Sequence, residues 1–167
     1  MKIRSEEPKD QPLVYSVNKA AFETSAEAEL VERLRNEAHP YISLVADEAG
    51  LIVGHILFTP VTLTGYAELK IMGLAPVAVL PDYQSKGIGS TLIMEGLRRC
   101  TTAGFGACVV LGHKGYYPRF GFTPSVNFGI ACEYDVPPEV FMVIELQPGY
   151  LHGASGTIQF HPAFNEI

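Results

Sequence analysis

An alternation of strand-like and helix-like hydrophobic patterns between residues 68 and 111 constrains the fold more than any other feature. A mostly apolar run spans Glu68–Leu80 and is typical of a central strand covered on both faces. A 3.6-residue period then predicts a helix over Gly87–Ala103, closed by Gly104, and a short buried strand follows at Ala107–Leu111. A strand, a helix and a second strand in this order require a parallel, right-handed crossover.

The rest of the chain adds antiparallel strands and two earlier helices. The patterns predict, in chain order, a strand at Lys2–Ser5, helices from Pro8 to about Phe22 and over Ala26–Glu37, a hairpin of Tyr41–Ala46 with Leu51–Leu63, a helical turn at Tyr116–Phe120, and a late strand at Phe141–Leu146. A mixed α/β sheet follows from this order. No repeat, linker or low-complexity tract interrupts it, so we expect a single domain over residues 1–167.

The two early helices are expected to be amphipathic. The inward positions are Leu13, Val14, Val17 and Ala21 in the first helix, and Leu30, Val31 and Leu34 in the second. Ser25 is expected to cap the second helix. The charged residues expected to face solvent there are Glu27, Glu29, Glu32, Arg33, Arg35 and Glu37.

The charge and hydropathy of the chain exclude several classes of partner. The net charge is −6, from 12 Lys and Arg against 18 Asp and Glu, and the cations do not cluster, so we expect no nucleic-acid-binding face. The longest apolar run, Ile71–Leu80, is roughly half the length of a membrane-spanning helix. The N-terminus lacks the apolar core of a signal peptide. We therefore expect a cytoplasmic protein that does not contact membranes.

The cysteines and histidines show no ligand spacing. Cys100, Cys108 and Cys132 form no CxxC pair, and the first two are expected to be small buried hydrophobic residues rather than nucleophiles. His113, His152 and His161 are not spaced as metal ligands. The sequence therefore predicts neither a disulfide framework nor a metal site.

The segment Leu74–Ser90 carries the most specific functional signal. Its strand ends at Pro81, and Gly87 and Gly89 follow where a helix begins. Helix starts present unpaired N–H groups and the positive end of the helix dipole, and glycine lets an anion approach the backbone closely. The P-loop spacing is absent, and so is the third glycine of the dinucleotide-binding motif. What is present is Gln-x-x-Gly-x-Gly preceded by Val-x-Pro-x-Tyr.

This pattern resembles the coenzyme A signature of the GNAT superfamily, the Gcn5-related N-acetyltransferases; it reads Val79-Leu-Pro-Asp-Tyr-Gln-Ser-Lys-Gly-Ile-Gly89. The order of elements is also similar, over about residues 2–124. The resemblance implies the GNAT fold, an α/β fold whose mixed, mostly antiparallel central sheet has a splayed parallel strand pair and helices on both faces. Pro76 within the central strand is compatible with such a splay.

The resemblance also implies a site for acetyl-CoA. The backbone amides of Ser85–Ser90 would hold the pyrophosphate, and the exposed edge of Val77–Val79 would pair with the pantetheine. The cofactor-binding residues implied are Val77, Ala78, Val79, Gln84, Ser85, Lys86, Gly87, Ile88, Gly89 and Ser90.

A second informative stretch is Tyr-Tyr-Pro-Arg-Phe-Gly-Phe, residues 116–122. Read without the rest of the chain, this stretch is an aromatic turn whose side chains are expected in the hydrophobic core. In GNAT proteins a tyrosine at this distance before Gly-Phe is commonly the general acid that protonates the leaving CoA thiolate, so the resemblance implies this role for Tyr117, with Tyr116 as the alternative. A phenol with a pKa near 10 is protonated at neutral pH. The preceding Gly112–Gly115, which replaces an asparagine frequent in the family, resembles the YhbS-like branch.

These features together predict an N-acetyltransferase that moves an acetyl group directly from acetyl-CoA to a primary amine. The general base stays open among Glu23, Glu68, His55 and His113. A non-catalytic acyl-CoA-binding or sensing module is the alternative, and the glycine spacing disfavours a nucleotide-binding protein. A peptide amine, a polyamine, an amino sugar and an antibiotic remain open as acceptors, and so does a homodimer paired through the C-terminal strands.

Overall fold

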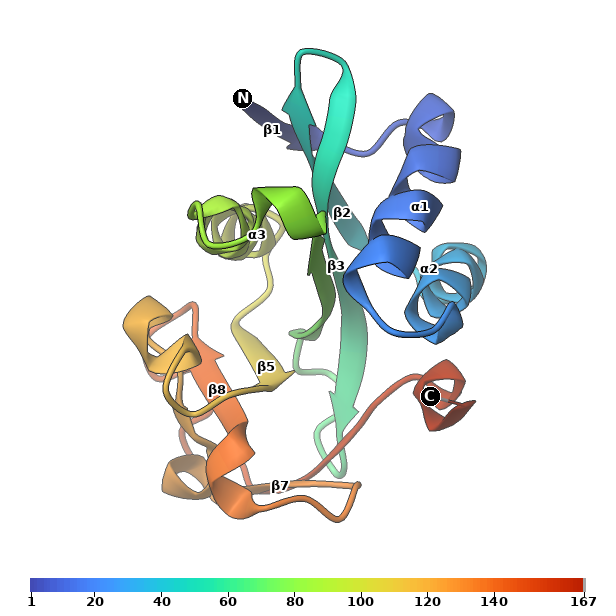
Figure 1. The fold of residues 1–167 in the computed structure, drawn as a ribbon. Coiled ribbons are helices and arrows are strands. Elements are labelled where there is room, and N and C mark those ends of the chain that lie inside the picture. The colour runs from blue at the N-terminus through green and yellow to red at the C-terminus, as the bar shows by residue number, and fades with distance from the viewer. Residues whose placement is uncertain (167) are drawn as a thin grey trace. The chain divides into compact units, whose positions relative to one another are not determined.

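The computed structural model describes residues 1–166 of the chain (Figure 1). Two compact units emerge from the internal contacts. Unit 1 comprises Met1–Thr59, Ala75–Gly96 and the C-terminal segment from Pro162, and unit 2 comprises Pro60–Leu74 and Leu97–His161. Each unit is described by itself.

The strands of unit 1 pair in antiparallel fashion. Strand β1 (Lys2–Ser5) pairs with β2 (Ile42–Glu48), and β2 forms a hairpin with β3 (Leu51–Leu63). The hairpin turn is tight because Ala49 and Gly50 both have positive φ, at 53° and 95°. Strand β4 (Ile71–Val79) ends in this unit, and just beyond it the Leu80 N–H donates to the Val53 carbonyl over 2.9 Å.

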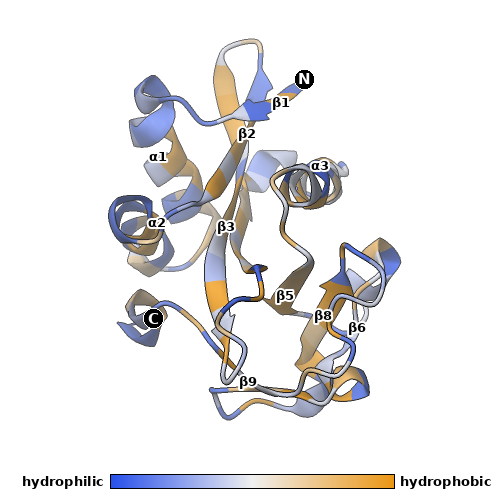
Figure 2. Ribbon diagram, turned by 180° about the vertical axis from the view of Figure 1, so that it is seen from behind, coloured by the Kyte–Doolittle hydropathy of each residue, from blue (hydrophilic) through white to orange (hydrophobic). Residues whose placement is uncertain are grey.

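Helices cover both faces of these strands. Helices α1 (Gln11–Ala21) and α2 (Ala26–Glu37) lie on one side of β3, and the first half of α3 (Ile88–Thr102) lies on the other (Figure 1). Side chains alternate along β3 accordingly. Leu57 packs in a core cluster with α1 and α2, whereas a Cβ at Gly54 would meet Ile88 and Leu92 of α3. Figure 2 shows the hydrophobic colour along β2 and β3 and the hydrophilic colour over much of α2.

Unit 2 contains the parallel strand pair that the predicted crossover requires. Residues Ile71–Gly73 of β4 pair in parallel with β5 (Ala107–Leu111), and β5 pairs antiparallel with β8 (Phe141–Glu145). The remaining strands are β6 (Thr123–Pro124), which pairs with β8, and β7 (Ile130–Cys132) and β9 (Gly156–Gln159), which pair with each other. Strand β9 also pairs with the last residues of β3. A cluster that includes Leu63, Val109, Phe141 and Ile158 forms the core of this unit.

The predicted fold class is confirmed: the fold is mixed α/β and mostly antiparallel, and it contains the parallel β4–β5 pair and helices on both faces. Several details differ. Leu13 is 41% exposed instead of inward. The predicted cap Ser25 makes no side-chain capping bond, and the Ala26 N–H donates to Thr24 Oγ1 instead. Among residues 1–166, no helix is long and apolar enough to cross a membrane.

Candidate active site

The end of β4 has one edge that β5 does not pair. The parallel register with β5 stops at Gly73. Beyond it, Ala75, Val77 and Val79 are half-buried, while Ala78 between them is buried in the core cluster of unit 1. The stretch predicted to bind pantetheine, Val77–Val79, is therefore an anchored strand end with partly accessible side chains on one face.

A tight turn joins this strand to α3. After a 3-10 turn at Pro81–Tyr83, Ser85 and Gly87 both adopt positive φ, at 61° and 84°. Positive φ at alternate residues turns neighbouring N–H groups toward a common point, which makes a concave anion site. The dipole of a 15-residue helix adds positive potential there. The turn therefore combines two positive-φ residues with the start of a helix, an arrangement that suits an anion.

Two side chains of the turn fold back onto it. Gln84 Nε2 donates to the Val79 carbonyl over 3.0 Å, which ties the loop to the strand end. The Lys86 ammonium lies 5.5 Å from the centroid of the Tyr83 ring. The Gly87 carbonyl accepts both the Thr91 N–H and the Thr91 hydroxyl, at 3.0 and 2.9 Å, and this closes the first turn of α3. A Cβ at Gly87 would meet no atom within 4 Å, so the space beside this residue is open.

Tyr117, in unit 2, is a buried phenol seated by aromatic neighbours. It begins the 3-10 turn Tyr117–Phe120, is 8% exposed, and meets Tyr116 and Phe122 edge-on at centroid distances of 5.2 and 5.8 Å. Burial, with the neighbouring Tyr116 adding to it, raises the pKa of Tyr117 to about 12. The phenol is therefore protonated throughout the neutral range, as a proton donor must be.

The loop before Tyr117 shapes its position. A Cβ at Gly112 would lie 2.2 Å from the Tyr117 ring, so only glycine leaves room for the ring as it is placed. His113 is exposed, and its carbonyl accepts the N–H groups of Tyr116 and Tyr117. Its Nδ1 accepts the Gly115 N–H over 3.0 Å. His113 thus organises the loop through its backbone and one ring nitrogen.

His55, a candidate base from the sequence, is enclosed in a polar chain inside unit 1. It is fully buried on β3, where its Nδ1 accepts a bond from Asn18 Nδ2 over 3.1 Å. Ser43 Oγ lies 2.9 Å from His55 Nε2 and donates its proton to Glu6 Oε1 over 3.0 Å, so Nε2 must carry the imidazole hydrogen. Burial, with a smaller contribution from Arg35, lowers the pKa of His55 to about 3. Both ring nitrogens already have hydrogen-bond partners within the fold, so neither is free to take a proton from a substrate.

The chain of contacts continues to an ion pair that the sequence did not predict. Arg35, expected at the solvent face of α2, donates from Nη2 and Nε to the two oxygens of Glu6 over 2.7 and 3.2 Å. The two side chains are only 9% and 4% exposed. The network links α1, β2, β3 and α2, which indicates a structural role.

Glu27 is the second charged residue of α2 whose predicted place is wrong. It is half-buried, and its Oε1 is enclosed without a hydrogen-bond partner, instead of facing solvent. The periodicity could have found it, because Glu27 stands three, four and seven residues before the inward Leu30, Val31 and Leu34. The two carboxylates proposed as bases from the sequence, Glu23 and Glu68, are exposed.

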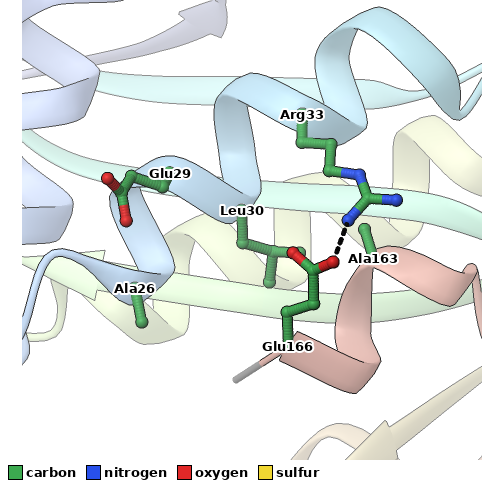
Figure 3. A pocket seen from close by; sticks show the side chains of 6 residues that line it. All are labelled: Ala26, Glu29, Leu30, Arg33, Ala163 and Glu166. Carbon is green, nitrogen blue, oxygen red and sulfur yellow. Dashed lines mark ion pairs between the residues drawn. The ribbon is translucent and has the colours of Figure 1, made fainter.

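Pockets also lie away from these residues. In unit 1, a pocket of about 270 Å³ lies between α2 and the C-terminal turn, where Arg33 Nη1 pairs with Glu166 Oε1 over 2.9 Å (Figure 3). In unit 2, a mostly apolar pocket of about 180 Å³ is lined by residues that include Cys132, Tyr134 and Phe141. Neither is lined by a residue of the predicted cofactor loop or by Tyr117.

Two cysteines are buried, and the described residues gather no candidate metal site. Cys100 and Cys108 are buried, as predicted, and burial raises the pKa of the Cys100 thiol to about 12 and shifts the pKa of Cys108 in the same direction. Within the described 166 residues, no group of three His, Cys, Asp or Glu side chains is placed to hold a metal ion. A covalent cysteine intermediate is therefore disfavoured.

Comparisons with known proteins agree on one family. A model of the acetyltransferase (GNAT) family matches residues 7–122. The chain is 35% identical over 168 residues to the uncharacterized N-acetyltransferase YhbS of Escherichia coli K12, and the match covers 100% of both chains. The crystal structure of E. coli YhbS in complex with CoA has a TM-score of 0.92 and 34% identity, covering 98% of this chain and 91% of that one. A GNAT family acetyltransferase from Brucella melitensis in complex with acetyl-CoA gives a TM-score of 0.81 and 38% identity, with 98% and 97% covered.

Proposed function

The chain belongs to the acetyltransferase (GNAT) family, and we propose that it is an N-acetyltransferase that moves an acetyl group from acetyl-CoA directly to a primary amine. The observation that carries this proposal is the turn at Ser85–Gly87 with the start of α3. Relatives similar over nearly the whole chain, crystallised with CoA and with acetyl-CoA, support the same donor.

The cofactor residues proposed are those named from the sequence. The backbone amides of Ser85–Ser90 would hold the pyrophosphate, since the positive φ of Ser85 and Gly87 and the helix dipole both favour an anion there. The edge of Val77–Val79, which β5 does not pair, would hydrogen-bond the amide groups of pantetheine.

The proposed chemistry is a direct displacement at the thioester. The lone pair of the neutral amine attacks the carbonyl carbon, a tetrahedral intermediate forms, and the C–S bond breaks as the amide forms. Tyr117 donates its phenolic proton to the departing sulfur and takes a proton back from solvent. An acceptor that binds as an ammonium gives one proton to solvent before its nitrogen attacks, and that nitrogen gives up a second proton as the amide forms. Tyr117 holds its proton before each turnover, because burial raises its pKa to about 12, although the same shift makes the phenol a weaker acid.

Titration calorimetry with acetyl-CoA tests the cofactor site. Gly87→Trp places a large side chain on a positive-φ residue beside the proposed phosphate loop, and Gly149→Trp is the matched control, since Gly149 also has positive φ and open space around it. We expect micromolar binding by the wild type and the control, and loss of binding in Gly87→Trp. Absence of binding to the folded wild type would refute the proposal.

One observation favours the non-catalytic alternative, an acyl-CoA-binding module. His55, one of the candidate bases, is locked inside unit 1 and kept neutral. CoA release in the presence of primary amines separates the two functions: a binding module would bind acetyl-CoA without releasing CoA.

A further inference from the structure

Three enclosed side-chain oxygens in unit 1 accept no hydrogen bond from the described residues: Asn18 Oδ1, Glu27 Oε1 and Thr59 Oγ1. Asn18 is 0% and Thr59 is 1% exposed. An enclosed polar atom without a partner loses the hydrogen bonds that it would make to water, and this loss destabilises the fold more when the group is charged. Such groups are rare in native proteins and often mark a place for a ligand or an ordered water.

The three residues stand on faces of α1, α2 and β3 that pack against one another. Glu27 stands one turn before Leu30 and Val31 on the inward stripe of α2. Thr59 stands two residues beyond Leu57 on β3, so its side chain is on the face that packs against α1 and α2.

Asn18 belongs to this region as well, because it bonds to His55, which shares that face of β3. The core cluster of Leu30, Val31 and Leu57 also contains Ala78, from the proposed pantetheine strand. The residues that carry the unpartnered oxygens therefore belong to elements whose inward faces build the cluster that the end of β4 joins.

The chemistry of the set points to a cation with several donors. A carboxylate oxygen, a hydroxyl and an amide oxygen can all accept, and a primary ammonium carries three N–H donors and no acceptor. A carboxylate also supplies the counter-charge, and a charge-assisted hydrogen bond is about twice as strong as a neutral one. We propose that Glu27 binds the protonated amine of the acceptor, with Thr59 as a second acceptor of its hydrogen bonds. This inference rests on the proposed acetyltransferase function.

The test compares Glu27→Gln with Glu32→Gln, which removes the same charge from an exposed position on the same helix. The amines used are spermidine, glucosamine, kanamycin and an alanyl tripeptide, assayed by CoA release. For each amine that the wild type acetylates, we expect the KM of Glu27→Gln for the amine to rise at least tenfold. The acetyl-CoA Kd should stay as in the wild type, and the Tm of Glu27→Gln should not fall, because the substitution removes an enclosed charge that has no partner. Glu32→Gln should behave as the wild type.

A second readout does not depend on turnover. With CoA bound, the amines should raise the Tm of the wild type and of Glu32→Gln but not that of Glu27→Gln. An unchanged KM in Glu27→Gln, equal thermal shifts in both variants, or no response of the wild type to any of the four amines would overturn the role of Glu27. Failure of the wild type to bind acetyl-CoA would instead refute the proposed function, so the two failures are distinguishable.

Discussion

The buried His55 should make the free energy of unfolding depend on pH in a window set by one residue. Its pKa is about 3 in the folded chain, against an ordinary value of 6.5. Between these values the unfolded chain binds a proton that the folded chain excludes. The stability contributed by keeping His55 neutral is therefore complete above about pH 6.5 and is lost progressively as the pH falls toward 3.

The size of the effect follows from the same two values. At pH 5, protonation of the unfolded state alone lowers the free energy of unfolding by about 2 kcal/mol relative to pH 8. The cause is structural, since the imidazole is fully buried and its Nδ1 already accepts a hydrogen bond from Asn18. A second ring proton would therefore break that bond and place a charge in a dry site.

Urea unfolding at pH 8 and pH 5 measures this contribution when the wild type is compared with His55→Gln. Other groups titrate over the same range, but their contributions cancel in the difference between the two proteins. We expect the wild type to lose about 2 kcal/mol more than His55→Gln between pH 8 and pH 5. His152→Gln, at an exposed position, is the matched control.

Equal losses in the wild type and His55→Gln would refute the reasoning, whatever the absolute stability of the variant. The ring nitrogens give an independent check by ¹⁵N NMR. At pH 7 the spectrum should show a neutral imidazole with its hydrogen on Nε2, because Ser43 donates its own proton to Glu6. The Nδ1–H tautomer would show that the hydrogen bonds that link Asn18, His55 and Ser43 have the opposite donor-to-acceptor direction.

Three further predictions concern the proposed acid and the packing of α3. Tyr117→Phe should lower kcat by about a hundredfold or more with the acetyl-CoA Kd unchanged, as steady-state kinetics and calorimetry would show, whereas a larger loss in Tyr116→Phe would move the acid to Tyr116. Gly112→Ala should also lower kcat, since its Cβ would lie 2.2 Å from the Tyr117 ring, and wild-type kcat in this variant would show that the ring position is unimportant. Gly96→Ala should destabilise unit 1 by about 1–3 kcal/mol in urea unfolding, because its Cβ would lie 2.2 Å from the buried Phe58 ring. An unchanged midpoint would contradict the packing described.

The order of elements was predictable because each is encoded locally. The bounds of α2 match the prediction, and α3 and the strand Ala107–Leu111 agree with it to within a residue, since continuous hydrophobic periods of 3.6 and apolar runs specify them. The strands β6, β7 and β9 were not predicted. They are two to four residues long, too short to show a period, and partners distant in the chain hold them in place.

The site was predictable only where its geometry belongs to the backbone. The two glycines at positions 87 and 89 predict a turn before α3 from the sequence alone, and Gly87 does adopt positive φ. Which charged side chains turn inward was not predictable from residue type, because burial of a charge depends on partners brought from other elements. Arg35 can be buried because it forms an ion pair with Glu6, which directly follows β1. No local pattern in α2 predicts this partner.

Glu27 shows where a stricter use of periodicity would have succeeded. Its spacing from Leu30, Val31 and Leu34 places Glu27 on the inward face of α2. Glutamate is nevertheless a residue type that is usually exposed to solvent. In the structure Glu27 takes the inward position that the spacing predicts, since its Oε1 is enclosed and has no partner among the residues described. A charged residue on the apolar stripe of a helix is thus a candidate for function when no residue of the fold satisfies it. Arg35, buried but paired with Glu6, does not meet that criterion, whereas Glu27 does.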